Sequence, residues 1–297
     1  MTSASSVVMW ARALRLHQWL KNLLILVPLL VSHKIATPGA LTLGLIGFIV
    51  FGLCASSAYL LNDLLDLKSD RLHPSKRHRP LAAGRMSHQT AVIAFILLLL
   101  AAFAVACWTL PWRFTAAMGA YFAVTVTYSL VLKRLMIVDV VTLAMLYTLR
   151  IIAGTLLFHL VMTFWMLAFS MFIFLSLALV KRYSEMLHAR NKGESDKLGG
   201  RGYFAQDLGI ISSMGTSSGY LSVMVLALYI QDPNTAVLYS NPRIIWLACP
   251  ILLYWVSRIW VLTHRGKMND DPVVFAIRDP VSLIVGGLFG LVFWLAI

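Results

Sequence analysis

Residues 41 to 80 read LTLGLIGFIVFGLCASSAYLLNDLLDLKSDRLHPSKRHRP. An apolar run of membrane-spanning length comes first, and three aspartates and a dense basic stretch follow it directly. At about 100° per residue on a helix, the polar side chains at the boundary fall within an arc of about 100° and share one face. They are Asn62, Asp63, Asp66 and Asp70. Acids at a membrane boundary are costly unless a cation pairs with them, so this stretch predicts a membrane fold with a functional site at its edge.

The composition indicates an integral membrane protein. Of the 297 residues, 60% are hydrophobic and 12% are charged, and the charged share is about half that of a soluble domain. A net charge of +13 would suggest nucleic-acid binding in a soluble chain. Here the basic residues lie in loops beside apolar segments, so we expect membrane lipid and phosphorylated substrates as partners, and no nucleic acid.

Nine apolar segments are long enough to cross a membrane. They lie near residues 21–37, 41–62, 89–110, 113–132, 138–158, 162–181, 210–230, 243–263 and 280–297. Basic residues precede the first segment and no small-residue cleavage site follows it, so we expect a retained helix and not a cleaved signal peptide. The pattern predicts an all-α membrane protein with nine transmembrane helices and one domain over residues 1–297.

The basic residues predict the orientation of the chain in the membrane. With the N-terminus in the cytoplasm, the cytoplasmic tail and loops hold 20 of the 25 lysines and arginines, against Lys34, Arg113 and Arg243 on the other side. Cytoplasmic loops of membrane proteins carry such an excess. The two long loops, near 64–88 and 182–209, then face the cytoplasm, and we expect the active site on the cytoplasmic face of the cell (inner) membrane.

The acid cluster predicts a magnesium–diphosphate site. Mg²⁺ prefers a few carboxylates together with phosphate oxygens and water. Asp63, Asp66 and Asp70 are therefore the expected metal ligands and catalytic residues, and Asn62 is an expected substrate contact. The alternative is a solvated helix end with ordinary surface acids. The one-sided arrangement at a membrane boundary favours the metal site.

A basic run follows the acids. Lys76, Arg77 and Arg79 are placed to bind phosphate, and the prolines around them suit a shaped loop. Alternatively, these cations only hold the loop on anionic lipid as part of the basic cytoplasmic charge. Their position next to the acid cluster favours substrate binding.

A second cluster, Lys181-Arg182-Tyr183-Ser184-Glu185, ends the segment 162–181. We expect Lys181 and Arg182 to bind phosphate and Glu185 to orient them, with Tyr183 as a further substrate contact. Two other interpretations stay open. Lys181 and Glu185 are four residues apart and could form an ion pair within a helix, and Tyr183 could be a membrane-interface anchor.

A third group of charges crowds a short loop. Asp270 and Asp271 open it, and an Arg278-Asp279 pair closes it. These residues are either substrate contacts, with Arg278 as the candidate cation, or helix caps and lipid-facing charge.

Two arginines lie within apolar segments. A charged side chain in a membrane span usually has a functional or paired role, so Arg150 is a candidate substrate contact, and Tyr147 lies one turn before it. Arg258 could snorkel toward the membrane surface.

The pattern Asn62-Asp63-x-x-Asp66-x-x-x-Asp70 resembles the first aspartate-rich motif of the UbiA superfamily of intramembrane prenyltransferases, and the resemblance covers nearly the whole chain. It implies an all-helical bundle around a central cavity, a requirement for Mg²⁺, and a polyprenyl substrate that enters sideways from the bilayer.

The chain departs from that superfamily at one place. Typical members carry a second aspartate-rich motif where this chain has Lys181-Arg182-Tyr183-Ser184-Glu185. A basic cluster there suits two phosphorylated substrates. Together with His73-Pro74-x-Lys76-Arg77-x-Arg79-Pro80 and Arg278-Asp279, it is similar to the decaprenyl-phosphate phosphoribosyltransferase branch.

That branch implies transfer of 5-phosphoribose from phosphoribosyl pyrophosphate to a polyprenyl phosphate. Lys181 and Arg182 would hold either the ribose 5-phosphate or the lipid phosphate, and the sequence leaves the choice open. It also leaves the polyprenyl chain length and the oligomeric state open.

Two rival functions remain. One is a true prenyltransferase that moves a polyprenyl group onto an aromatic or quinone acceptor, and the missing second acidic motif counts against it. The other is a transporter or lipid-binding protein. Transporters place charges near the middle of the bilayer, whereas nearly all the charge here lies at one face, which favours an enzyme.

Overall fold

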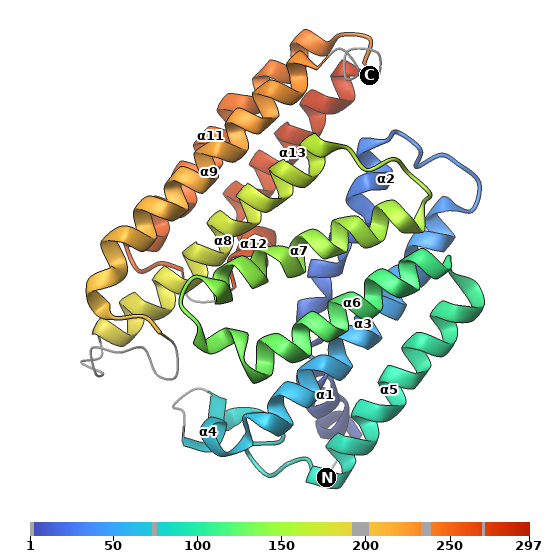
Figure 1. The fold of residues 1–297 in the computed structure, drawn as a ribbon, viewed down its shortest axis with the longest axis vertical. Coiled ribbons are helices and arrows are strands. Elements are labelled where there is room, and N and C mark those ends of the chain that lie inside the picture. Colours follow the sequence, from blue (N-terminus) through green and yellow to red (C-terminus); the bar gives the residue numbers. More distant parts are fainter. Residues whose placement is uncertain (1–2, 73–75, 192–201, 233–238, 269–270) are drawn as a thin grey trace. The chain divides into compact units, whose positions relative to one another are not determined.

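The computed structural model describes residues 3–72, 76–191, 202–232, 239–268 and 271–297, and every regular element in these ranges is helical (Figure 1). The chain divides into two compact units. The first comprises Met1–Leu132 and Leu149–Val161, and the second Lys133–Thr148 and Met162–Ile297. Helix α7, Val138–Leu157, contributes its first half to the second unit and its last half to the first.

The first unit is organised along helix α3. Its elements are α1 (Ser3–Ala13), η1 (Leu16–Leu26), α2 (Val27–Val31), α3 (Ala40–Leu65), α4 (Leu67–Leu72), η2 (Lys76–His78), α5 (His88–Thr109) and α6 (Trp112–Leu130). Small residues of α3 admit close neighbours. A Cβ atom on Gly52 would lie 2.7 Å from the ring of Trp19, so this glycine allows η1 to pack directly on α3.

The second unit contains the long helices of the C-terminal half. Besides its part of α7, it holds α8 (Phe164–Asn191), η4 (Ala205–Asp207), α9 (Leu208–Gln231), η5 (Pro242–Leu247), α11 (Ala248–His264), α12 (Pro272–Arg278) and α13 (Pro280–Ala296). Polar groups join these helices internally. Ser176 on α8 donates to the carbonyl of Gly215 on α9 at 2.7 Å and accepts from the indole of Trp260 on α11 at 3.0 Å.

Six helices in the described part of the chain are long and apolar enough to cross a membrane. They span Ala40–Leu65, His88–Thr109, Val138–Leu157, Phe164–Asn191, Ala205–Gln231 and Pro242–His264. Two bent pairs, one at each end of the chain, raise the number to eight at most. The predicted count of nine exceeds this range, because α6, which covers the expected segment 113–132, is not among the candidates.

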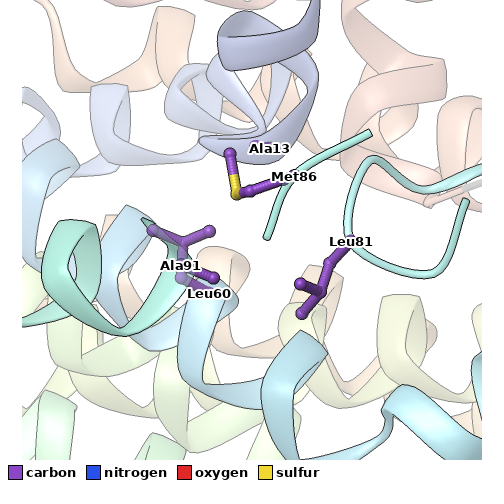
Figure 2. Packing of buried hydrophobic residues seen from close by; sticks show 5 residues of the cluster. All are labelled: Ala13, Leu60, Leu81, Met86 and Ala91. Carbon is purple, nitrogen blue, oxygen red and sulfur yellow. The ribbon is translucent and has the colours of Figure 1, made fainter. Parts of the chain in front are cut away.

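A buried apolar cluster fixes the loop between η2 and α5 (Figure 2). It consists of Ala13, Leu60, Leu81, Met86 and Ala91. Ala13 belongs to α1, Leu60 to α3 and Ala91 to α5. Leu81 and Met86 lie in the loop. The loop also closes on itself, because the backbone N–H of Arg85 donates to the carbonyl of Pro80 at 2.9 Å. The start of this loop is thereby held beside the end of α3.

Candidate active site

The acids of the first cluster lie where α3 gives way to α4. The structure corrects the expected single helix, because α3 ends at Leu65 and Asp66 is its C-terminal cap. The helical hydrogen bonding nevertheless continues across the break. The N–H of Asp66 donates to the carbonyl of Asn62 at 2.9 Å, and the N–H of Asp70 donates to that of Asp66 at 2.8 Å.

Arg79 joins the two buried acids of this cluster. Its Nη1 lies 3.0 Å from Oδ1 of Asp63 and 2.5 Å from Oδ2 of Asp70. Asp63 is 5% exposed and Asp70 is 2% exposed. The two carboxylate oxygens are therefore within about 5.5 Å of each other, around one cationic nitrogen.

A second guanidinium, that of Arg15, binds the same oxygen of Asp63. The Arg15 side chain also lies over the ring of Tyr59, 4.9 Å from its centroid. Nothing in the sequence separates Arg15 from the other basic residues near the N-terminus. Arg15 reaches Asp63 because the chain folds back onto α3.

The backbone around Arg15 is fastened to α3. Arg15 has a φ of 51°, in the left-handed region, where α1 ends and η1 begins. Ser56 of α3 donates to the carbonyl of Leu14 at 2.8 Å and accepts from the indole of Trp19 at 2.9 Å. These bonds fasten the junction between α1 and η1 on both sides and direct the Arg15 side chain to Asp63.

The other predicted residues of this cluster are closer to the surface. Asn62, Asp66 and Lys76 are half-buried, and Arg77 is exposed. His73 and Pro74, which belong to the predicted basic motif, lie outside the described residues.

The paired carboxylates fit a magnesium ion. Oxygens of Asp63 and Asp70 already surround a positive charge, and carboxylate oxygens are the donors that Mg²⁺ prefers. In the described ranges, no three His, Cys, Asp or Glu side chains gather as a metal site. Mg²⁺ commonly uses only one or two protein carboxylates and takes its other ligands from substrate phosphate and water. The arrangement therefore suits a metal ion that arrives with a phosphorylated substrate.

Arg182 is the centre of the second cluster, and its side chain is 0% exposed. Its Nη2 lies 2.6 Å from Oδ2 of Asp139, in the first turn of α7, and its Nη1 donates to Glu185. Both carboxylates face one guanidinium, so Arg182 has its ionic partners inside the second unit. Asp139 lies at the start of the expected segment 138–158, and its position in the sequence alone indicates no role.

Tyr203 completes this network. Its hydroxyl donates to Oδ1 of Asp139 at 2.5 Å and accepts from the N–H of Ile137 at 2.8 Å. The guanidinium of Arg182 lies over its ring, 5.6 Å from the centroid. Burial raises the pKa of the Tyr203 hydroxyl, so that it stays protonated as the donor to Asp139. No local sequence signal identifies Tyr203, because all of these partners are far from it in the chain.

Lys181 belongs to a different pair. Its Nζ lies 3.6 Å from Oδ2 of Asp271, which also accepts from the hydroxyl of Tyr147 at 3.2 Å. Asp271 caps α12, since its Oδ1 accepts from the N–H of Val273 at 3.1 Å. The expected helix-cap interpretation of Asp271 is therefore observed, and Asp270 lies outside the described residues.

The remaining candidates of the second unit are dispersed. The hydroxyl of Tyr183 lies 2.9 Å from Nδ1 of His264, and Arg278 is exposed. The partner of Asp279 is not its neighbour in the predicted Arg278-Asp279 pair. Asp279 binds Arg258 through two hydrogen bonds of 2.6 and 3.0 Å, which gives the arginine a partner within the protein.

Arg150 lies in the interior of the first unit. Its Nε donates to Oδ1 of Asn22 at 3.1 Å, and its Nη2 donates to the hydroxyl of Tyr121 at 2.9 Å. The guanidinium also faces the ring of Phe51, 5.7 Å from its centroid. Tyr147 lies one turn before Arg150 in the sequence, and its hydroxyl donates a hydrogen bond to Asp271.

Comparison with known proteins places these features in a family context. The sequence profile of the UbiA prenyltransferase family matches residues 25–278. The chain is 37% identical to the uncharacterized protein y4nM of Sinorhizobium fredii and 37% identical to nodulation protein NoeC of Azorhizobium caulinodans, over 97% and 96% of its own length. It spans 55% of the length of y4nM and 92% of NoeC.

More distant relatives carry a named activity. The chain is 27% identical to decaprenyl-phosphate phosphoribosyltransferase of Mycolicibacterium smegmatis, over 92% of this chain and 87% of that protein. The structure of a UbiA homolog from Archaeoglobus fulgidus bound to GPP and Mg²⁺ has a TM-score of 0.70 at 17% identity and covers 97% of this chain and 99% of that chain. At that identity, the likeness shows a shared multi-span helical fold.

Proposed function

The chain belongs to the UbiA prenyltransferase family, and on that premise we propose that it transfers 5-phosphoribose from phosphoribosyl pyrophosphate to a polyprenyl phosphate and releases diphosphate. Membership makes it an integral, multi-pass membrane transferase. The observation that carries the finer proposal is the basic end of α8. Lys181 and Arg182 lie there beside their carboxylate partners. Cations at this place suit two phosphorylated substrates, which together bring a diphosphate, a ribose 5-phosphate and a lipid phosphate.

The acidic cluster is assigned to the donor. Asp63, Asp66 and Asp70 would hold Mg²⁺, and the ion would supply positive charge to offset the negative charge on a departing diphosphate. Arg79 binds diphosphate oxygens from beside these carboxylates, and Lys76, Arg77 and Asn62 are the neighbouring substrate contacts. The bonds of Arg79 to the two buried acids support this assignment.

The basic cluster is assigned to the other phosphates. Lys181 and Arg182 bind either the ribose 5-phosphate or the lipid phosphate, and Glu185 orients Arg182 through their hydrogen bond. Three more side chains are proposed as substrate contacts: Tyr183, Arg150 and Arg278. Asp139 and Tyr203 act on this cluster as positioning residues, because they fix the guanidinium of Arg182.

The bond changes need no strong general base. An acceptor phosphate is already anionic at pH 7, so its oxygen can attack C1 of the ribose directly. The bond from C1 to the diphosphate oxygen breaks as the new bond from C1 to the lipid phosphate forms. Attack from the side opposite the diphosphate inverts C1. The electrons of the broken bond leave with diphosphate, whose charge the protein's cations stabilise.

We also propose nine membrane crossings in one domain around a central cavity, with the N-terminus and the active site on the cytoplasmic side. Each bent pair would count as one crossing, and α6 would be the ninth, since 19 helical residues are about 28 Å long. The excess of lysine and arginine on one side supports the orientation.

The second candidate function is prenyl transfer from a polyprenyl diphosphate to an aromatic or quinone acceptor. The observation in its favour is the fold shared with the Archaeoglobus fulgidus UbiA homolog, which was bound to GPP. One assay separates the two functions. Purified protein is incubated with Mg²⁺ and either labelled phosphoribosyl pyrophosphate plus polyprenyl phosphate, or prenyl diphosphate plus an aromatic acceptor.

We expect a labelled lipid product only from the first mixture. If prenyl diphosphate is consumed with the aromatic acceptor, and phosphoribosyl pyrophosphate is not consumed with polyprenyl phosphate, the ribosyl proposal is wrong and the second candidate replaces it.

A further inference from the structure

The two buried carboxylates of the acidic cluster already have cationic partners within the protein. Arg79 binds Asp63 and Asp70 with one nitrogen, at 3.0 and 2.5 Å. Arg15 binds the Asp63 oxygen that Arg79 also contacts. Two negative charges are thus matched by two positive charges before any metal ion arrives.

This balance of charge disfavours the binding of a free divalent metal ion. A metal ion bound by Asp63 and Asp70 would lie close to the guanidinium of Arg79, and like charges repel strongly where little water screens them. A metal ion that brings a diphosphate changes the balance. The diphosphate supplies negative charge and several acceptor oxygens, to which arginines bind with paired hydrogen bonds.

The protein holds these arginines so that only their side chains need to move. The backbone after Arg79 is fixed by the buried Leu81, and the backbone beside Arg15 is fixed by the hydrogen bond from Ser56 to Leu14. The side chains of Arg79 and Arg15 remain 25% and 20% exposed. Each can leave a carboxylate and bind an incoming anion without unfolding its segment.

We propose that Arg79 and Arg15 are specificity-determining residues that make the carboxylate site bind a metal–diphosphate complex in preference to the free metal ion. The proposal rests on the proposed function only in taking Asp63 and Asp70 as the metal ligands. It does not depend on whether the diphosphate leaves a ribose or a prenyl group. It also gives Arg15 a role that its place in the sequence did not indicate.

The test measures binding of Mn²⁺ as a probe for Mg²⁺, without turnover. The full-length protein in detergent is titrated with Mn²⁺ alone and with preformed Mn²⁺–pyrophosphate, and bound metal is followed by electron paramagnetic resonance. We expect the complex to bind at least about tenfold more tightly than the free ion, a size typical of coupling between two ligands. Because coupling is reciprocal, Mn²⁺ must strengthen pyrophosphate binding by the same factor.

Three variants locate the effect. Arg79→Gln and Arg15→Gln should bind free Mn²⁺ about tenfold more tightly than the wild type and should lose much of the preference for the complex. Arg85→Gln is the matched control, because Arg85 is an exposed arginine in the loop that follows Arg79 and has no assigned role in binding, and it should behave as the wild type. Melting temperatures show which variants are folded.

Two results would overturn the proposal. One is a wild-type protein that binds free Mn²⁺ as tightly as its pyrophosphate complex. The other is a folded Arg15→Gln protein with the metal affinities of the Arg85→Gln control. Arg15→Gln decides the matter if Arg79→Gln does not fold, since Asp63 then still has Arg79 as a partner. Inorganic pyrophosphate carries no ribose or prenyl group, so failure here leaves the proposed function intact, and the donor assay can fail without affecting this result.

Discussion

At the scale of single residues, Asp63 and Asp139 illustrate how the chain tolerates acids at the ends of membrane helices. Each carboxylate is buried, and each binds a guanidinium and at least one further group. Removing one member of such a pair leaves an uncompensated charge and costs about 3–5 kcal/mol, whereas the intact pair contributes little net stability. We therefore expect these networks to fix the geometry of the proposed substrate sites.

Tyr203→Phe tests the network around Arg182. The change removes one hydroxyl and leaves Oδ1 of Asp139 and the N–H of Ile137 without that partner. We expect a loss of about 1–3 kcal/mol in the free energy of unfolding, because both groups are deprived of a hydrogen bond in a buried place. Thermal unfolding in detergent measures it. Tyr220→Phe, at an exposed hydroxyl, is the control, and equal melting temperatures for the two variants would contradict the assigned role.

Asp66→Asn tests the metal assignment. Loss of one charged ligand should lower the rate on the order of a thousandfold, equivalent to about 4 kcal/mol of transition-state stabilisation. Because Asp66 is half-buried at a helix cap, we expect the protein to stay folded. Initial rates with and without EDTA, together with a melting curve, provide the measurement. Normal turnover by the folded variant, or full activity in EDTA, would remove Asp66 and Mg²⁺ from the mechanism.

At the scale of elements, the sequence pattern predicted those features that depend on residues close together in the chain. The apolar segments became helices, and the spacing of Asp63 and Asp70 brought both to one guanidinium. The break at Asp66 and the contact of Arg15 with Asp63 could not be predicted, since both depend on segments that meet only after folding. The same reason applies to Tyr203.

Gly154→Ala tests how closely elements of the first unit approach each other. A Cβ atom on Gly154, in α7, would lie 2.0 Å from the backbone oxygen of Ile25 in η1, and backbone cannot yield as a side chain can. We expect a loss of about 1–3 kcal/mol from overpacking. Gly286→Ala is the matched control, because nothing lies within 4 Å of its Cβ position and alanine favours a helix over glycine. Melting temperatures should fall for the first variant and hold or rise for the second.

At the scale of the whole molecule, the distribution of charge along the chain predicts how the helices cross the membrane. Lysine and arginine exceed aspartate and glutamate by 25 to 12, and the excess gathers in alternate connections between apolar segments. Insertion follows such asymmetry, because basic loops stay in the cytoplasm. The same connections carry the acidic cluster and the basic end of α8, so the orientation of the chain also decides on which side its chemistry would take place.

Cysteine labelling tests this orientation. In a background with Cys54, Cys107 and Cys249 replaced by alanine, single cysteines are introduced at the exposed positions Thr37 and Ala83. Thr37 lies between α2 and α3, and Ala83 lies in the loop after Arg79. With the N-terminus inside, an impermeant maleimide added to intact spheroplasts should label Thr37→Cys and spare Ala83→Cys, while permeabilised membranes should label both. The opposite pattern would overturn the orientation and move the acidic cluster to the outer face, where a supply of cytoplasmic phosphoribosyl pyrophosphate could not reach it. Equal labelling of both positions in intact spheroplasts would contradict a single crossing by α3, on which the placement of the cluster at the membrane boundary depends.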